Sequence, residues 1–159
     1  MFIAHLPAGY LLTTAIQRAV HQPSQKLLAL GLVASIAPDF DLAYHYLIDN
    51  QQTLHHKYMA HWPLAWLAVS GFAALLALLV NKRGWLLPIG IVLANGLLHM
   101  LLDTVVGGIY WLAPFNETSW RLFNIPARYG FWIGNFILHW TFALELLIVL
   151  AAYLQWKRR

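Results

Sequence analysis

The sequence contains no cysteine, and few of its residues are charged. Without cysteine the chain can form neither disulfide bonds nor thiolate metal sites. Only 10% of its residues are charged and 60% are hydrophobic, whereas a typical soluble domain is about a quarter charged and about half apolar. So few polar residues cannot form the water-facing surface of a soluble domain of this size. The composition therefore predicts an integral membrane protein.

Basic residues outnumber acidic ones and give a net charge of +4, but they are scattered in small groups. A protein that reads nucleic acid concentrates such residues on one face, so no direct contact with nucleic acid is expected. The first residues lack the basic start of a cleavable signal peptide, and we expect them to remain in the mature protein.

Five apolar segments are each near the length of about 20 residues that crosses a bilayer. They cover residues 2–20, 26–48, 62–80, 85–106 and 131–156. The first is the weakest because Pro7 and Gly9 interrupt it, and none alternates like a barrel strand. The sequence therefore predicts an all-α fold, a polytopic transmembrane helical bundle of about five membrane segments, as a single integral membrane domain over residues 1–159.

Lysine and arginine in short loops predict the orientation of the bundle. If the five segments alternate, one side carries Arg18, Lys26, Lys82, Arg83, Lys157, Arg158 and Arg159, and the other carries Lys57, Arg121 and Arg128. Because basic loops favour the cytoplasm, we expect a cytoplasmic C-terminus and an outer N-terminus. The predicted location is the bacterial cytoplasmic (inner) membrane.

Side chains that bind metal ions gather at the outer ends of four segments or in the loop beside them. They are His5, Asp39, Asp41, His55, His56, His61, His99 and Asp103. Aspartate inside a membrane segment costs about 2.5–3.5 kcal/mol and usually marks function. Imidazole and carboxylate are common zinc ligands. We therefore predict an outer-side metal site with ligands from His5, Asp39, Asp41, His56, His61, His99 and Asp103.

Each part of this pattern also has a simpler interpretation. His99 and Asp103 share a helical face and could hydrogen-bond to each other. Asp39 and Asp41 would point to different sides of an intact helix; Pro38 could break that helix and turn both inward, or the two could cap a new turn. The histidines at 55–61 could belong to an exposed polar loop.

Three other charged positions are candidates for substrate binding, and one for catalysis. Arg121 and Arg128 lie in the long outer loop, where guanidinium groups suit phosphate or anchor lipid headgroups, and Lys57 follows His56. Glu145, in the fifth segment, is the deepest charged residue by position. It could transfer protons, support a ligand or form an interhelical hydrogen bond.

Taken in order, these motifs resemble those of the bacterial family of LexA-binding, inner-membrane-associated metal-dependent hydrolases. The matching elements are His5 with Gly9, Pro38-Asp39-Phe40-Asp41, His56-Lys57 to His61, and His99, Asp103, Gly107 and Pro114-Phe115. The chain departs from the family at Lys57, where arginine is usual, and at Ala60 and Trp62, where threonine and serine are usual. The resemblance implies a metal site and a hydrolase.

The expected function is a membrane-embedded metal-dependent hydrolase of a lipid-borne phosphoester, which uses a metal-activated water. Seven candidate ligands exceed the four of one zinc, so we expect one or two Zn²⁺ ions or another divalent metal. Asp39, Asp41 and Glu145 are the catalytic candidates, and membrane lipids and a lipid-like substrate are the expected partners. The alternatives are a metal or proton transporter, or a non-catalytic membrane adaptor with a structural metal.

Overall fold

The computed structural model describes residues 3–158, which are helical apart from loops and one isolated β-bridge between Ile109 and Trp120. The long helices are α1 (His5–Ala19), α2 (Gln25–Ile36), α4 (Pro63–Leu79), α5 (Leu86–Asp103) and α7 (Phe142–Lys157). The short ones are η1 (Ala37–Phe40), α3 (Asp41–Leu47), η2 (His55–Lys57), η3 (Met59–His61), η4 (Arg83–Trp85) and α6 (Trp132–Ile137). The predicted all-helical fold is confirmed over this range.

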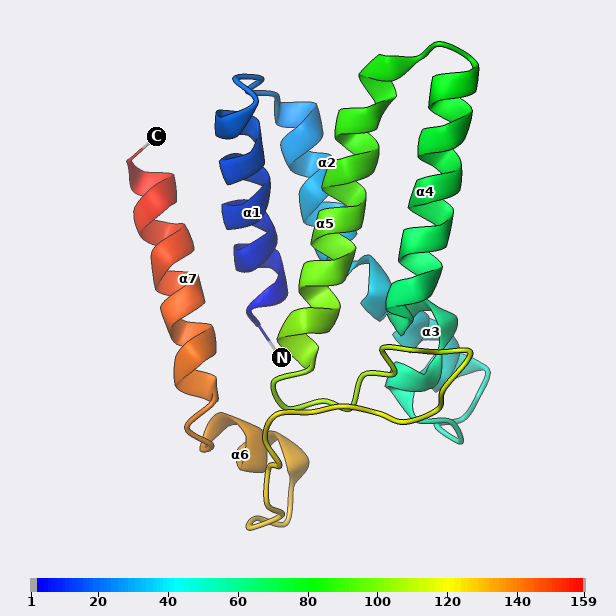
Figure 1. Cartoon of the computed structure of the whole chain (residues 1–159). Coiled ribbons are helices and arrows are strands. Elements are labelled where there is room, and N and C mark those ends of the chain that lie inside the picture. Colours follow the sequence, from blue (N-terminus) through cyan, green and yellow to red (C-terminus); the bar gives the residue numbers. More distant parts are fainter. Residues whose placement is uncertain (1–2, 159) are drawn as a thin grey trace.

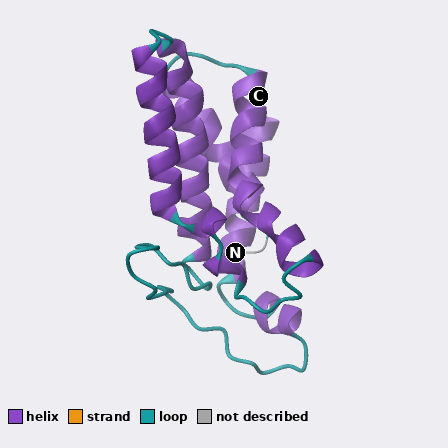
Figure 2. Cartoon of the chain, turned by 90° about the vertical axis from the view of Figure 1, so that its right-hand side faces the viewer, coloured by secondary structure: helices purple, strands orange, loops and turns teal. Residues whose placement is uncertain are grey.

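The long helices stand side by side, and their connections differ strongly between the two ends of the bundle (Figures 1 and 2). Helix α5 packs against α1, α2 and α4, and α7 packs against α1. Short connections join α1 to α2 and α4 to α5 at one end. The long loops, residues 48–62 and 104–131, lie at the other end, together with the start of α1 and the end of α5 (Figure 1).

Small residues let the helices around α1 and α5 approach closely. A Cβ on Gly31 of α2 would lie 2.0 Å from Thr13 Oγ1, and one on Gly9 of α1 would lie 2.4 Å from Ser35 Cβ. A Cβ on Gly96 of α5 would lie 2.2 Å from the ring of Trp66. Such contacts are typical of helices that pack in a membrane, where burial of apolar surface gives no driving force.

Buried polar side chains add hydrogen bonds along the inner face of α1. Asn95 Nδ2 donates to Thr13 Oγ1 at 3.0 Å, and Gln155 Nε2 donates to Thr14 Oγ1. At the far end of the helix, Gln17 Nε2 donates to the carbonyl oxygen of Ser24 at 2.9 Å. In membrane proteins such bonds contribute on average about 0.6 kcal/mol each. They tie α1 to α5, to α7 and to the turn before α2.

Two helical stretches, Gln25–Leu47 and Arg83–Asp103, are long and apolar enough to cross a membrane, and Pro63–Leu79 is a shorter apolar helix. Large apolar side chains face outward along α4, where Val69, Phe72 and Leu79 are 70%, 63% and 72% exposed. Lipid is the solvent that suits such a face. Each predicted segment contains one long helix, but five spans are not confirmed and remain a prediction.

Two of the predicted segments are not single helices. The stretch 26–48 breaks at η1, which contains Pro38. The stretch 131–156 breaks between α6 and α7, where His139 Nδ1 lies 2.8 Å from Thr141 Oγ1. Glu145 therefore lies in the first turn of α7, at the end with the long loops.

Replacing Gly31 with alanine should destabilise the bundle. Its Cβ would collide with Thr13 Oγ1, which Asn95 holds in place, and overpacking typically costs about 1–3 kcal/mol. Gly71→Ala is the matched control, because a Cβ there meets nothing within 4 Å and alanine favours a helix by about 0.5–1 kcal/mol. Thermal unfolding in detergent should show a lower Tm for Gly31→Ala alone; equal values for both variants would contradict this packing of α1 against α2.

Candidate metal centre

All seven predicted metal ligands meet at the end of the bundle that carries the long loops. His5 opens α1, Asp39 lies in η1 and Asp41 opens α3; His56 lies in η2, His61 in η3, and His99 and Asp103 in the last turns of α5. Nitrogen–oxygen distances of 3.0–3.9 Å connect every one of them to another member of this His/Asp cluster. Residues from across the sequence thus converge on one site.

The break at Pro38 explains why Asp39 and Asp41 both face the cluster. Two positions apart on an α-helix, their side chains would point about 200° apart. The 3₁₀ turn η1 is followed directly by α3, and this change of path brings Asp39 Oδ1 to 3.5 Å from His99 Nε2 and Asp41 Oδ2 to 3.0 Å from His61 Nδ1. The predicted inward turn of both carboxylates is confirmed.

Four of these residues are spaced like the ligands of one metal ion. Asp39, His61, His99 and Asp103 each offer one atom, and these atoms lie within 4.8 Å of one another. His99 Nε2 is 3.1 Å from Asp103 Oδ2, and Asp39 Oδ1 is 3.5 Å from His99 Nε2 and 3.7 Å from His61 Nε2. Tetrahedral zinc with bonds of about 2.0–2.2 Å separates its ligand atoms by about 3.3–3.6 Å. The donor set therefore fits such an ion.

The two central histidines are held in the orientation that a metal ligand needs. His99 Nδ1 lies 2.9 Å from the carbonyl oxygen of Ser35, to which it can donate, and His61 Nδ1 lies 3.0 Å from Asp41 Oδ2. In each ring this leaves Nε2 facing the cluster, buried and without a hydrogen-bond partner. Metal-binding histidines characteristically donate their other N–H to a carbonyl or carboxylate, so Asp41 supports His61.

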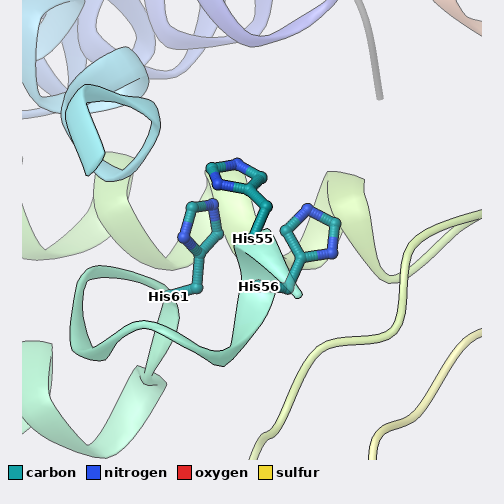
Figure 3. Close-up of side chains that lie close together, drawn as sticks. All are labelled: His55, His56 and His61. Atoms are coloured by element: carbon teal, nitrogen blue, oxygen red, sulfur yellow. The ribbon is translucent and has the colours of Figure 1, made fainter. Parts of the chain in front are cut away.

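A second possible ligand group shares His61 with the first. His55, His56 and His61 come from two successive 3₁₀ turns, and their rings lie beside one another (Figure 3). Asp103 of the first group also lies near His56 of the second. Its Oδ1 is 3.1 Å from His5 Nε2, and its Oδ2 is 3.7 Å from His56 Nε2. Shared donors of this kind are compatible with one ion or with two.

The cluster is closed toward the bundle and open on one side. The side chains of His61 and His99 are 0% exposed, whereas that of Asp39 is 33% exposed. His55 and His56 are half-buried. A ligand or substrate can therefore approach beside Asp39.

The two neighbouring histidines of η2 have opposite pKa shifts. Burial disfavours the charged form of His55, but contacts with Asp39 and Asp41 outweigh it and raise the pKa to about 9. Burial lowers the pKa of His56 to about 4, although the charge of Asp103 opposes the shift. At neutral pH His55 is protonated and His56 is not. A metal ion requires neutral imidazole, so metal binding through His55 must release a proton.

Glu145 fixes the start of α1 rather than facing the opening. Its Oε2 accepts the backbone N–H groups of Ile3 at 2.5 Å and Ala4 at 3.1 Å. The next residue, His5, stacks on His99 with ring centroids 3.9 Å apart. We therefore interpret Glu145 as a positioning residue for His5, and its catalytic role remains a prediction.

The charged groups of the predicted substrate-binding residues make no ion pair with the aspartates of the cluster among the described residues. Lys57 Nζ pairs with Glu117 Oε2 at 3.1 Å. Arg121 lines a separate cavity beside the end of α5, and the exposed Arg128 donates its backbone N–H to Asn135. Among the described residues, none of the three pairs within 4.0 Å with an aspartate of the cluster.

Sequence reasoning missed His55 as a member of the site. Its Nε2 lies 3.3 Å from Asp39 Oδ1 and its Nδ1 lies 3.0 Å from Asp41 Oδ1. The loop before it is held by Asp49, which accepts hydrogen bonds from the hydroxyl of Tyr58 at 2.8 Å and the N–H of Thr53 at 2.7 Å. The adjacent pair His55-His56 was the available signal, but spacing alone could not show that both rings turn inward.

In a comparison with protein families, the chain matches the model described as YdjM inner membrane protein over residues 1–158. No curated protein and no solved structure matches the chain. Because the match covers almost the whole chain, the protein belongs to this family. The family and the two apolar helices support an inner-membrane location. The description says nothing of LexA binding or hydrolysis.

Purified protein should contain about one or two divalent ions, which a chelator removes. His99→Ala should lower this metal content, and the affinity of the wild type should rise with pH up to about 9, because an ion on Asp39 competes with protonated His55 for that carboxylate. Elemental analysis measures the metal content, and competition with metal-binding dyes measures the affinity.

The matched control for that variant is His21→Asn. His21 is exposed, lies in the turn after α1 and has a φ of 54°, which asparagine tolerates. The metal content of the His21→Asn variant should equal that of the wild type. Metal-free wild-type protein, prepared without chelator in zinc-containing medium, would contradict the assignment.

Proposed function

We propose that this member of the YdjM inner membrane protein family is a membrane-embedded, metal-dependent hydrolase that acts on a lipid-borne phosphoester. The proposal is carried by one observation. Donor atoms of the buried His61, His99 and Asp103 and of the partly exposed Asp39 face one another at the separations of metal ligands, and the site is open beside Asp39. A catalytic zinc site keeps a coordination position open to water, and the partly exposed Asp39 marks the side on which water could reach the ion.

The residues of the cluster would have different roles in metal binding and catalysis. Asp39, His61, His99 and Asp103 would hold the ion, and Asp41 would keep His61 in the binding tautomer. A divalent ion supplies Lewis acidity and makes water acidic enough to react near neutral pH. Asp41, the aspartate of the cluster outside this ligand set, would accept the proton of the attacking water as general base.

The surroundings of the opening favour a substrate that remains in the bilayer. Phe40, next to Asp39, is 60% exposed, and Tyr44 and Leu47 on α3 are 48% and 79% exposed. Apolar and aromatic side chains of this kind lie at the boundary between hydrocarbon and headgroups. A lipid could keep its tail beside α3 and present its phosphoester to the cluster.

The transporter alternative has less support. The buried histidine, aspartate and glutamate side chains in residues 3–158 are His5, His61, His99, Asp103 and Glu145, and all lie at the end with the long loops. Along the remaining length of α1 the buried polar side chains are neutral, as Thr13, Thr14 and Gln17 are. An ion path needs ionisable or coordinating groups through the whole depth. The adaptor alternative predicts a closed site, whereas Asp39 is partly exposed.

Asp39→Asn should abolish hydrolysis, because it removes a charged ligand of the ion. The assay is a screen of lipid phosphates and acyl lipids with metal-loaded protein in nanodiscs, with metal content measured on the same samples. His21→Asn serves as the active control. If no phosphoester is cleaved by fully loaded wild type, or if Asp39→Asn keeps its activity, the hydrolase proposal fails.

The cluster should lie at the outer face of the inner membrane. The chain has no cysteine, so a single cysteine at Asn116, in the exposed loop beside the cluster, can be labelled without background. An impermeant maleimide should label it in intact cells, and a reporter fused after Arg159 should be active only in the cytoplasm. The reverse pattern would move the site to the inner face.

A further inference from the structure

The structure contains a second potential binding site on the outer side of α5, away from the His/Asp cluster. It is a cavity of about 480 Å³ between the end of α5 and the loop 111–122. Leu101, Thr104 and Leu112 are among its lining residues, with Trp120 and Arg121 at the loop side.

This cavity lies on a different face of α5 from the cluster. Leu101 stands two positions after His99 and two before Asp103, so its side chain points about 200° away from each. Burial agrees with this geometry: Leu101 is 56% exposed, whereas His99 and Asp103 are 1% and 2% exposed. The cavity is therefore separate from the opening beside Asp39 and from the proposed site of hydrolysis.

The walls of the cavity are held in place by nonlocal hydrogen bonds. The N–H of Leu122 donates to the carbonyl of Thr104 at 2.8 Å, and Trp111 Nε1 donates to Thr104 Oγ1 at 2.9 Å. Trp120 pairs with Ile109 through two backbone bonds of 3.0 and 2.9 Å. Arg121, between Trp120 and Leu122, is thereby fixed next to the end of α5.

The chemistry of the cavity is apolar with one cation at its edge. Leu101, Leu112 and Trp120 are 56%, 51% and 60% exposed. Arg121 has no carboxylate within 4.0 Å among the residues that the structure describes. The candidate span Arg83–Asp103 ends at this level, where tryptophans typically meet lipid headgroups.

We propose that this cavity binds an anionic phospholipid of the surrounding membrane. The acyl chains contact Leu101, Leu112 and Trp120, and the guanidinium of Arg121 donates charge-assisted hydrogen bonds to the phosphate. A zwitterionic lipid offers the same chains but compensates its phosphate with its own cation. The site therefore distinguishes lipids by headgroup charge.

Native mass spectrometry of delipidated protein in detergent tests this proposal. Phosphatidylglycerol and phosphatidylcholine with identical chains are titrated separately, and the wild type should prefer phosphatidylglycerol. Arg121→Gln should weaken phosphatidylglycerol binding about tenfold and remove the preference. Arg128→Gln is the matched control, because Arg128 lies in the same loop, is exposed and does not line the cavity, and it should behave as the wild type.

A second variant tests the apolar part of the site. Leu101→Trp fills the cavity from an exposed position, so it should weaken both lipids while unfolding and metal content stay unchanged. Equal affinity of the wild type for both lipids, or unchanged binding by Arg121→Gln, would overturn the proposal. Displacement of the lipid by excess inorganic phosphate would also overturn it, since the site would then bind phosphate alone. These outcomes do not depend on hydrolysis at the His/Asp cluster.

Discussion

The burial of charge at one end of an apolar bundle is the constraint on which the rest of this structure depends. Asp39 and Asp103 together lie within 3.1–3.9 Å of five histidine rings. Removing a carboxylate from water is unfavourable unless it is paired and hydrogen-bonded, so the elements that carry the histidines must meet the aspartates. This requirement joins the start of α1, the turns before α4 and the end of α5. A divalent cation would balance the carboxylates that the histidines only partly neutralise.

The remaining length of the bundle holds these elements in register. Close contacts at Gly9 and Gly31 set α1 against α2, and Asn95 ties α1 to α5 through Thr13. His5 consequently reaches Asp103, although 98 positions separate them in the chain. The candidate metal ligands are thus confined to one end of the bundle. The small and neutral polar residues along the rest of its length hold the helices together. The outward faces of the helices are available for contact with lipid, and the proposed site at Arg121 is one example.

The sequence allowed the helical class, the break at Pro38 and the gathering of seven candidate ligands to be predicted, because composition and local spacing determine them. Other features depend on contacts between distant residues. The break before α7 lies in a continuous apolar run, so the sequence did not show that Glu145 lies in a first helical turn. The inward turn of His55 depends on the path of two 3₁₀ turns, and the position of Arg121 depends on backbone bonds between residues 104 and 122. Neither leaves a periodic signal.

X-ray diffraction from zinc-loaded crystals, recorded on both sides of the zinc absorption edge, would locate the ion. We expect an anomalous peak within bonding distance of His61 Nε2, His99 Nε2, Asp39 and Asp103, at about 2.0–2.2 Å from each. A second peak near His55 and His56 would indicate a dinuclear centre. Anomalous density confined to the protein surface, with the cluster free of it, would contradict the account.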